Sequence, residues 1–228
     1  FNAPHTPLQV PDKYYRIYKG IDPSEGIDPK LLPLADMNEK SDEDARRVYA
    51  MVTNIDDNLN QLFQKLEVLG IEENTIVIFM TDNGPQQARF VGGMRGRKSS
   101  VHRGGIRVPF FISYPSKYSG NREMNQMAAH IDLLPTLSQL CGASLPKDRK
   151  IDGRSFVPAL EGKTLSERSF FSYWTRKFPE KYNNVALQRG NYKLIGKKDF
   201  DADVEDFELY NLEEDPFEIN NLVGQNKE

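Results

Sequence analysis

The sequence has little that could build a cross-linked or membrane-bound protein. Its 228 residues contain one cysteine, Cys141, which excludes an internal disulfide and a zinc cluster built from cysteines. The longest apolar runs, such as 75–80 and 108–112, are far shorter than the ~20 residues that a membrane-spanning helix needs. A chain of this length can instead bury a sizeable core in one large or two modest domains.

The sequence also lacks a strong excess of either charge. The formal net charge is -3 at pH 7, and acidic and basic residues are mixed along the chain. No basic surface for nucleic acid or for an anionic membrane is therefore expected. An anionic ligand would have to be held by a few local groups, because the overall charge does not attract it.

A signal peptide is missing from the first residues. The stretch from Phe1 to Pro7 has neither a basic segment nor an apolar one, and it is typical of a strand end that runs into a proline-braced loop. We expect the chain to begin inside a longer protein, so this absence carries no information about the cellular compartment.

The first half of the chain predicts a proline-rich extended segment followed by a long helix. Six prolines within residues 1–40 exclude a long helix there. From Asp42 to Leu69 an amphipathic helix is expected, with Ser41 as its cap, acidic residues in its first turn and Gly70 at its end. We predict that its apolar stripe packs on a core; the stripe consists of Val48, Val52, Ile55, Leu59, Leu62, Leu66 and Leu69.

A buried strand is expected directly after this helix. Residues 74–81 form an apolar, β-branched run that is too short for a helix, and residues 107–113 form a second one. A helix followed by a buried strand is half of a βαβ unit, which predicts an α/β fold with a mostly parallel sheet. Ligands of such sheets gather beyond the carboxyl ends of the strands, which is where Asp82 and Asn83 lie.

The end of the chain predicts a different architecture. A helix is expected over 131–141 and ends at Gly142. After it come short aromatic and β-branched pieces that predict a small antiparallel sheet, at 169–174, 185–188, 192–195 and 208–211. We therefore divide the chain into an α/β part, residues 1–165, and an antiparallel subdomain, residues 166–228.

Four residues are candidates for chemistry. Asp82 and Asn83 carry adjacent oxygens that suit calcium or magnesium, although Asp-Asn-Gly-Pro taken alone favours an ordinary turn. Lys98 lies in a loop rich in glycine and serine and can point at an anion, but most such lysines are solvated surface residues. His5 can donate a proton near neutral pH, whereas a lone loop histidine is more often structural.

The other two histidines and the cysteine are interpreted as structural. His130 receives that interpretation without reserve, and His102 receives it with more doubt because it shares the loop of Lys98. Cys141, in Cys-Gly-Ala-Ser-Leu, is expected to be a core cysteine on the apolar side of a helix end.

Five stretches in this order resemble the sulfatase family, the arylsulfatase-like enzymes of the alkaline phosphatase superfamily. They span nearly the whole chain and are Asn2-Ala3-Pro4-His5-Thr6-Pro7; Thr81-Asp82-Asn83-Gly84; Gly96-Arg97-Lys98 with Gly104-Gly105-Ile106-Arg107-Val108-Pro109; His130-Ile131-Asp132-Leu133-Leu134-Pro135-Thr136; and Tyr192-Lys193-Leu194-Ile195 with Glu208-Leu209-Tyr210-Asn211-Leu212, Asp215-Pro216 and Asn221-Leu222.

The resemblance implies the C-terminal portion of an alkaline-phosphatase-like α/β domain and the hydrolysis of sulfate esters in the complete protein. Asp82 and Asn83 would be calcium ligands, Lys98 a sulfate contact, and His5 the histidine beside the leaving oxygen. The stretches at Pro135-Thr136 and Asp215-Pro216 would be fold markers. A periplasmic, extracellular or lysosomal location and a sulfated small molecule or carbohydrate as substrate are implied in the same way.

Two departures from the family pattern stand out. The family usually has a glutamate before the Gly-Gly of the Lys98 loop, and this chain has Arg103, which adds positive charge near the expected anion. The family's formylglycine nucleophile, made from a Cys-x-Pro-x-Arg motif, has no counterpart here, and we expect it upstream. The chain alone should then be inactive.

Two alternatives remain open at this point. One is a phosphatase or phosphonate hydrolase of the same superfamily, although three histidines are few for a two-zinc site. The other is a sulfatase-like protein that binds without catalysis. The upstream sequence distinguishes the second from an enzyme, while the identity of the sulfated substrate does not follow from these residues.

Overall fold

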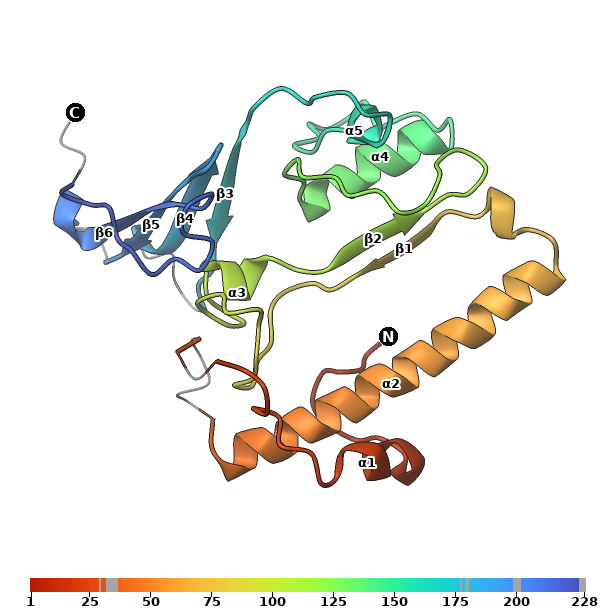
Figure 1. Cartoon of the computed structure of the whole chain (residues 1–228). Coiled ribbons are helices and arrows are strands. Elements are labelled where there is room, and N and C mark those ends of the chain that lie inside the picture. The colour runs from red at the N-terminus through yellow and green to blue at the C-terminus, as the bar shows by residue number, and fades with distance from the viewer. Residues whose placement is uncertain (29, 32–36, 177, 179–180, 199–201, 226–228) are drawn as a thin grey trace. The chain divides into compact units, whose positions relative to one another are not determined.

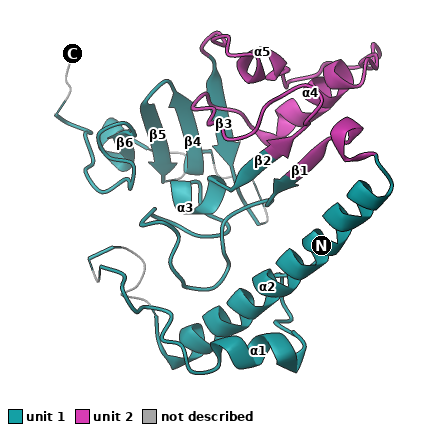
Figure 2. Ribbon diagram, turned by 45° about the vertical axis from the view of Figure 1, so that its right-hand side comes forward, with its two compact units in different colours: residues 1–70, 79–111, 168–228 teal, residues 71–78, 112–167 magenta. Residues whose placement is uncertain are grey.

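The structure is a computed structural model that describes residues 1–28, 30–31, 37–176, 178, 181–198 and 202–225. Two compact units divide the chain (Figure 2): unit 1 contains residues 1–70, 79–111 and 168–228, and unit 2 contains residues 71–78 and 112–167. These units are defined by packing, and the domain boundary after residue 165 stays a prediction. In the part of the chain that is described, no helix has both the length and the apolar character needed to cross a bilayer.

The predicted long helix is confirmed as α2, Glu39–Val68 (Figure 1). It begins three residues earlier than predicted, because the cap is Asn38 and not Ser41: Ser41 N donates to Asn38 Oδ1 at 3.1 Å. Within the apolar stripe, Val48 and Ile55 are buried, whereas Val52 is 50% exposed and Leu62 is 48% exposed. The prediction of one continuous buried face was therefore wrong, both at Val52 and at the C-terminal end of the helix.

A short helix, α1 (Asp12–Tyr18), lies against the N-terminal half of α2. Three tyrosines make the contact: Tyr14 donates to Asp57 at 2.8 Å and Tyr15 to Glu43 at 2.8 Å, and Tyr18 lies 2.7 Å from Thr53 Oγ1. The prediction of an extended segment was wrong at α1, because a proline that ends one helix can also precede the start of another, as Pro11 does here. Positions 29 and 32–36 of the predicted extended segment lie outside the described residues.

The two predicted apolar strands are β1 (Val77–Met80) and β2 (Phe110–Ser113), and they pair with each other. Backbone hydrogen bonds flank the pair, from Ser116 N to Glu73 O at 3.0 Å and from Gly84 N to Gly105 O at 2.8 Å. Glu73 precedes β1 and is bonded to Ser116, which follows β2. Gly84 follows β1 and is bonded to Gly105, which precedes β2. The strands β1 and β2 therefore run antiparallel. The parallel neighbour expected for 74–81 is not found among the described strands, because an apolar run predicts burial and not strand direction.

Unit 2 is organised around a buried aspartate. The predicted helix over 131–141 consists of a 3-10 turn, His130–Asp132, and α4, Leu133–Leu140, followed by Gly142 at a positive φ of 67°. Asp132 accepts from the backbone N–H groups of Ala129 and Arg154, both at 2.9 Å. Thr136 donates to Asp132 O at 2.7 Å and accepts from Phe156 N, which precedes the short helix α5 (Val157–Leu160), at 3.1 Å.

The prediction that Cys141 is a core residue was wrong. It is exposed and not a core residue. The residue caps the C-terminus of α4, where the chain turns away from the buried face of the helix.

The C-terminal residues form the predicted antiparallel sheet, in the order β3-β4-β5-β6. The strands are β3 (Ser169–Tyr173), β4 (Asn183–Arg189), β5 (Tyr192–Lys197) and β6 (Phe207–Asn211), with a 3-10 turn, Val204–Asp206, before the last. Ala186, Ile195, Tyr210 and Leu212 form its core together with Val101. Because Val101 belongs to the loop that carries Lys98, this loop is packed into the core of the sheet.

Candidate active site

The loop between β1 and β2 holds three of the four predicted site residues, and closely packed backbone gives it its shape. A Cβ atom on Gly104 would lie 2.3 Å from Gly96 O, and one on Gly84 would lie 1.8 Å from Gly104 O. Residues 103–106 form α3 (Arg103–Ile106) at the end of this loop. The glycines allow the two ends of the loop to touch backbone to backbone, which any side chain would prevent.

This packing brings the Asp82 turn and Lys98 together along the backbone. Lys98 N donates to Pro85 O at 2.8 Å, three residues beyond Asp82. The two candidates are 16 positions apart in the sequence, so the juxtaposition is a product of the loop fold. The prediction that their side chains converge on one point stays a prediction.

Asp82 and Asn83 keep oxygens that can bind a cation. Asp82 Oδ1 accepts from Asn83 N at 2.9 Å, and the Asn83 amide donates through Nδ2 to Gly84 O at 2.8 Å. Among the described residues no hydrogen bond reaches Asp82 Oδ2 or Asn83 Oδ1. These two hard oxygens fit calcium as ligands, but calcium takes six to eight, and the described residues contain no group of three or more acidic, histidine or cysteine residues around a common point.

Lys98 is half-buried, and within the described chain its ammonium has no hydrogen bond or ion pair. A lysine in that state is available to an anion. Arg103, the residue at the family's usual glutamate position, is partly buried, and burial together with Arg107 lowers its pKa, while Glu218 opposes this effect.

His5 lies in an exposed loop of unit 1. Its Nδ1 is 2.7 Å from Thr6 O. Because a carbonyl oxygen only accepts, Nδ1 carries a proton, and His5 could act as an acid through Nε2 only when its ring is doubly protonated. Across the described residues no hydrogen bond joins His5 to the loop over 81–107. Its place beside the leaving oxygen therefore stays a prediction.

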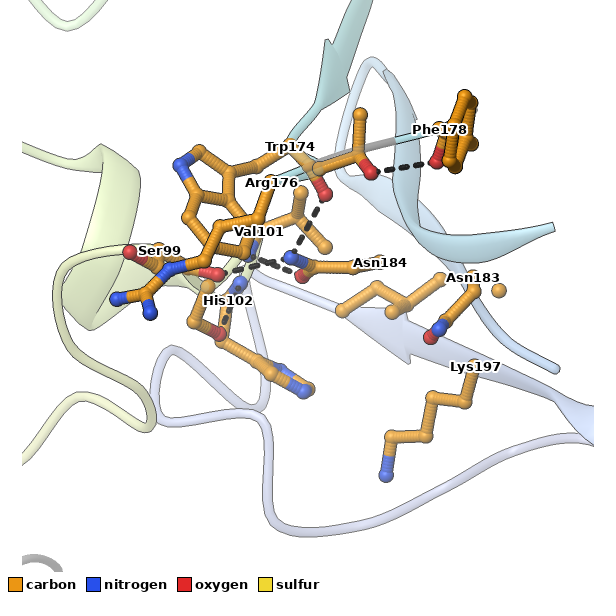
Figure 3. A pocket seen from close by; sticks show the side chains of 13 residues that line it. Ser99, Val101, His102, Trp174, Arg176, Phe178, Asn183, Asn184 and Lys197 are labelled. Carbon is orange, nitrogen blue, oxygen red and sulfur yellow. Dashed lines mark hydrogen bonds between the residues drawn. The ribbon is translucent and has the colours of Figure 1, made fainter. Parts of the chain in front are cut away.

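A residue that the sequence analysis did not single out holds the Lys98 loop. Asn184 is the extra residue of a β-bulge in β4 and has a positive φ of 54°. Its side chain donates to Ser99 O at 2.8 Å and accepts from Val101 N at 3.1 Å (Figure 3). Ser99, next to Lys98, also has a positive φ, 73°, and Asn184 stabilises this strained conformation.

A buried ion pair holds the other side of the same loop. Glu218, fully buried, accepts from Lys193 at 2.5 Å and from Arg103 N at 2.7 Å, and lies 3.3 Å from His102 Nδ1. Burial alone would raise the pKa of Glu218, but His102, Lys193 and the Arg103 N–H outweigh it and lower the pKa. Burial lowers the pKa of Lys193, against the effect of Glu218. We take Glu218 to be ionised.

His102 belongs to a network of charged side chains, and its interpretation as a structural residue stays a prediction. Its Nε2 lies 3.6 Å from Glu208, which also contacts Arg95, and Arg95 donates to Tyr210 at 2.8 Å. The sequence carries a weak signal for this network, because Lys193, Glu208 and Glu218 each lie among apolar residues. Partners 116 positions apart, as His102 and Glu218 are, leave no periodic pattern.

Two family models match this chain. A model of the sulfatase family matches residues 1–143, and a model of the N-sulphoglucosamine sulphohydrolase C-terminal region matches residues 97–228. Each covers more than half of the chain, and the chain belongs to the sulfatase family. Neither matching model describes a phosphatase.

Individual relatives agree with this assignment. An N-acetylglucosamine-6-O-sulfatase of Bacteroides thetaiotaomicron is 29% identical over 188 residues, which are 79% of this chain and 32% of that protein. A putative sulfatase of Bacteroides fragilis matches 99% of this chain and 49% of its own with a TM-score of 0.74 at 24% identity, which shows the shared α/β fold. A structure in complex with its substrate D-glucosamine-2-N,6-O-disulfate matches 82% of this chain and 37% of its own, with a TM-score of 0.59 and 26% identity. The chain spans about a third of the length of the curated relatives that it matches first.

Proposed function

We propose that the full-length protein containing this chain hydrolyses sulfate esters, and that its substrates are sulfated carbohydrates. The observation that supports the proposal is the hydrogen bond from Lys98 N to Pro85 O, which joins the backbone at Lys98, a lysine whose ammonium has no partner among the described residues, to the turn that contains Asp82 and Asn83. A cation beside hard oxygen ligands is the arrangement that a sulfate group requires. The relatives that act on N-acetylglucosamine-6-O-sulfate and bind a disulfated glucosamine support a sugar as the substrate.

Each candidate residue has a separate task in this proposal. Asp82 and Asn83 would supply two of the oxygen ligands of a calcium ion, which when bound adds positive charge beside the sulfate oxygens. Lys98 would neutralise the sulfate oxygens, and His5 would protonate the departing oxygen. The nucleophile, by family resemblance a formylglycine, belongs to sequence that this chain does not contain. The proposed compartment is periplasmic, extracellular or lysosomal.

The leaving group separates the tasks of His5 and Lys98. A general acid matters most when the departing alkoxide is basic, so His5→Ala should slow a sugar sulfate by ~10²–10⁴-fold and a nitrophenyl sulfate far less. Sulfate oxygens are charged whatever the leaving group, so Lys98→Ala should slow both substrates by similar factors.

The measurement is kcat/KM of both variants of the full-length protein on both substrates, at one pH and with saturating calcium. Equal losses for His5→Ala on the two substrates would remove His5 from the role of acid. Absence of turnover of every sulfate ester by the wild-type protein would favour the alternative of a sulfatase-like binding protein.

A further inference from the structure

A cavity in unit 1 begins one residue after Lys98. It has a volume of about 650 Å³, within the range of ~300–1,000 Å³ typical of small-molecule sites. The Lys98 loop forms one wall with residues 99–102. The other walls are residues 174–176, which follow β3, and residues 183–184 of β4 and 195–197 of β5 (Figure 3). The cavity and Lys98 therefore share one loop, although Lys98 itself is not among the lining residues.

The walls of the cavity have the composition of a site for an anionic sugar. Trp174, the only tryptophan in the chain, is 38% exposed there. The guanidinium of Arg176 lies 5.9 Å from the centre of the Trp174 ring, and Lys197 and the amide of Asn183 face the same space. An indole ring can pack on the apolar face of a sugar while cations and amides bind its anionic and hydroxyl groups.

The charge of these walls is opposite to that of the whole chain. Arg176 and Lys197 are cations, and none of the described lining residues is acidic, although the chain has a net charge of -3. Glu208 pairs with Lys197 from outside the lining residues, which leaves Arg176 as the stronger attraction for an anion.

We propose that this cavity binds a further anionic sugar residue of a sulfated oligosaccharide, next to the sugar that carries the scissile sulfate. The inference rests on the proposed function, because Lys98 marks where that sulfate is bound. It makes Trp174 and Arg176 residues that determine specificity for substrates longer than one sugar.

Two substrates of different length test the proposal in the full-length protein. Trp174→Ala and Arg176→Ala should each raise KM for a sulfated glycosaminoglycan hexasaccharide about tenfold and leave kcat/KM for p-nitrophenyl sulfate unchanged, because the aryl sulfate has no second sugar to occupy the cavity. Trp174→Phe keeps an aromatic face and should recover most of the loss. Matched controls are Phe171→Ala and Arg189→Ala, an exposed aromatic residue on β3 and an exposed arginine on β4 outside the cavity lining.

Calorimetric binding of the same hexasaccharide, and of its chemically desulfated form, separates this proposal from the proposed function. Binding that depends on Trp174, on Arg176 and on sulfation upholds the cavity even if no sulfate ester is hydrolysed. Normal hydrolysis with unchanged hexasaccharide KM in both cavity variants overturns it and leaves the function intact. Equal losses on both substrates, or equal losses in the control variants, also overturn it.

Discussion

At the scale of single residues, Asn184 has a larger role than its place in a strand suggests. Its three hydrogen bonds reach Ser99 O, Val101 N and Trp174 O, so one side chain ties β3 and the Lys98 loop to the bulge of β4. None of these three hydrogen bonds involves Lys98 itself. Any effect of Asn184 on catalysis would therefore pass through the position of the loop.

We predict that Asn184→Gly lowers kcat/KM for p-nitrophenyl sulfate about tenfold or more, because glycine tolerates the positive φ but removes the hydrogen bonds to the loop, each worth ~1 kcal/mol. The measurement is a double-mutant cycle with Lys98→Ala in the full-length protein. If Asn184 acts through Lys98, the second substitution should add almost no loss in the Lys98→Ala background.

Asn121→Gly is the matched control, since Asn121 also has a positive φ, 59°, and lies outside this loop. Fully additive losses in the cycle would mean that Asn184 serves stability alone and does not position Lys98.

At the scale of elements, the loop between β1 and β2 depends on backbone contact more than on side-chain packing. Three carbonyl oxygens crowd Gly104. A Cβ atom there would lie 2.3 Å from Gly96 O, 2.7 Å from Arg95 O and 2.9 Å from Met94 O. Backbone oxygens cannot move aside as a flexible side chain can, and Gly104 N also donates to Arg95 O at 2.7 Å. The loop and the start of α3 are therefore a single packed structure.

We predict that Gly104→Ala reduces the proposed sulfatase activity of the full-length protein at least a hundredfold and destabilises the protein by ~2–4 kcal/mol, because the new methyl group forces the loop open. The unfolding midpoint and kcat/KM would be measured on the same preparation. Gly120→Ala is the control, since nothing lies within 4 Å of its added Cβ. Activity close to wild type in Gly104→Ala would show that the loop tolerates another conformation.

At the scale of the whole molecule, unit 1 joins segments that are far apart in the sequence. Glu218, near the C-terminus, is held by Lys193 from β5 and in turn holds the backbone of Arg103 in α3. A carboxylate that is buried and paired in the folded state, but solvated in the unfolded state, makes stability depend on pH.

We predict that Glu218→Gln costs ~3–5 kcal/mol at pH 7, because Lys193 is left buried without its counter-charge. The pKa of Glu218 is lowered in the folded state, so its stabilising effect is complete above the unfolded pKa of ~4.3 and is lost as the pH falls towards the folded value. The difference in unfolding free energy between wild type and variant should therefore shrink on acidification from pH 7 to pH 3.

Denaturant unfolding at a series of pH values measures this difference. Glu214→Gln, at an exposed glutamate of the same segment, should change stability by less than ~0.5 kcal/mol at every pH. A difference for Glu218→Gln that stays constant with pH would mean that the Glu218 carboxyl does not ionise in the folded protein.

Local patterns determined most elements of this protein. The α2 helix, the two apolar strands, the glycine that ends α4 and the four C-terminal strands all follow from the spacing of apolar residues and from turn residues. Family order supplied the site candidates Asp82, Asn83, Lys98 and His5. The elements depend on residues within a few positions of one another, and the site candidates depend on short sequence motifs. Both kinds of signal are visible in the sequence alone.

Only the tertiary structure decided the rest. The antiparallel pairing of β1 with β2, the bulge that aims Asn184 at Ser99, and the buried contact of Lys193, Glu218 and His102 depend on partners that can be more than 80 positions apart. Hydrogen bonds and ion pairs between distant residues form only when packing brings them together, and they leave no period in the sequence. The exposure of Cys141 and the half-buried stripe of α2 have the same cause, because burial depends on what covers a face as well as on how apolar the face is.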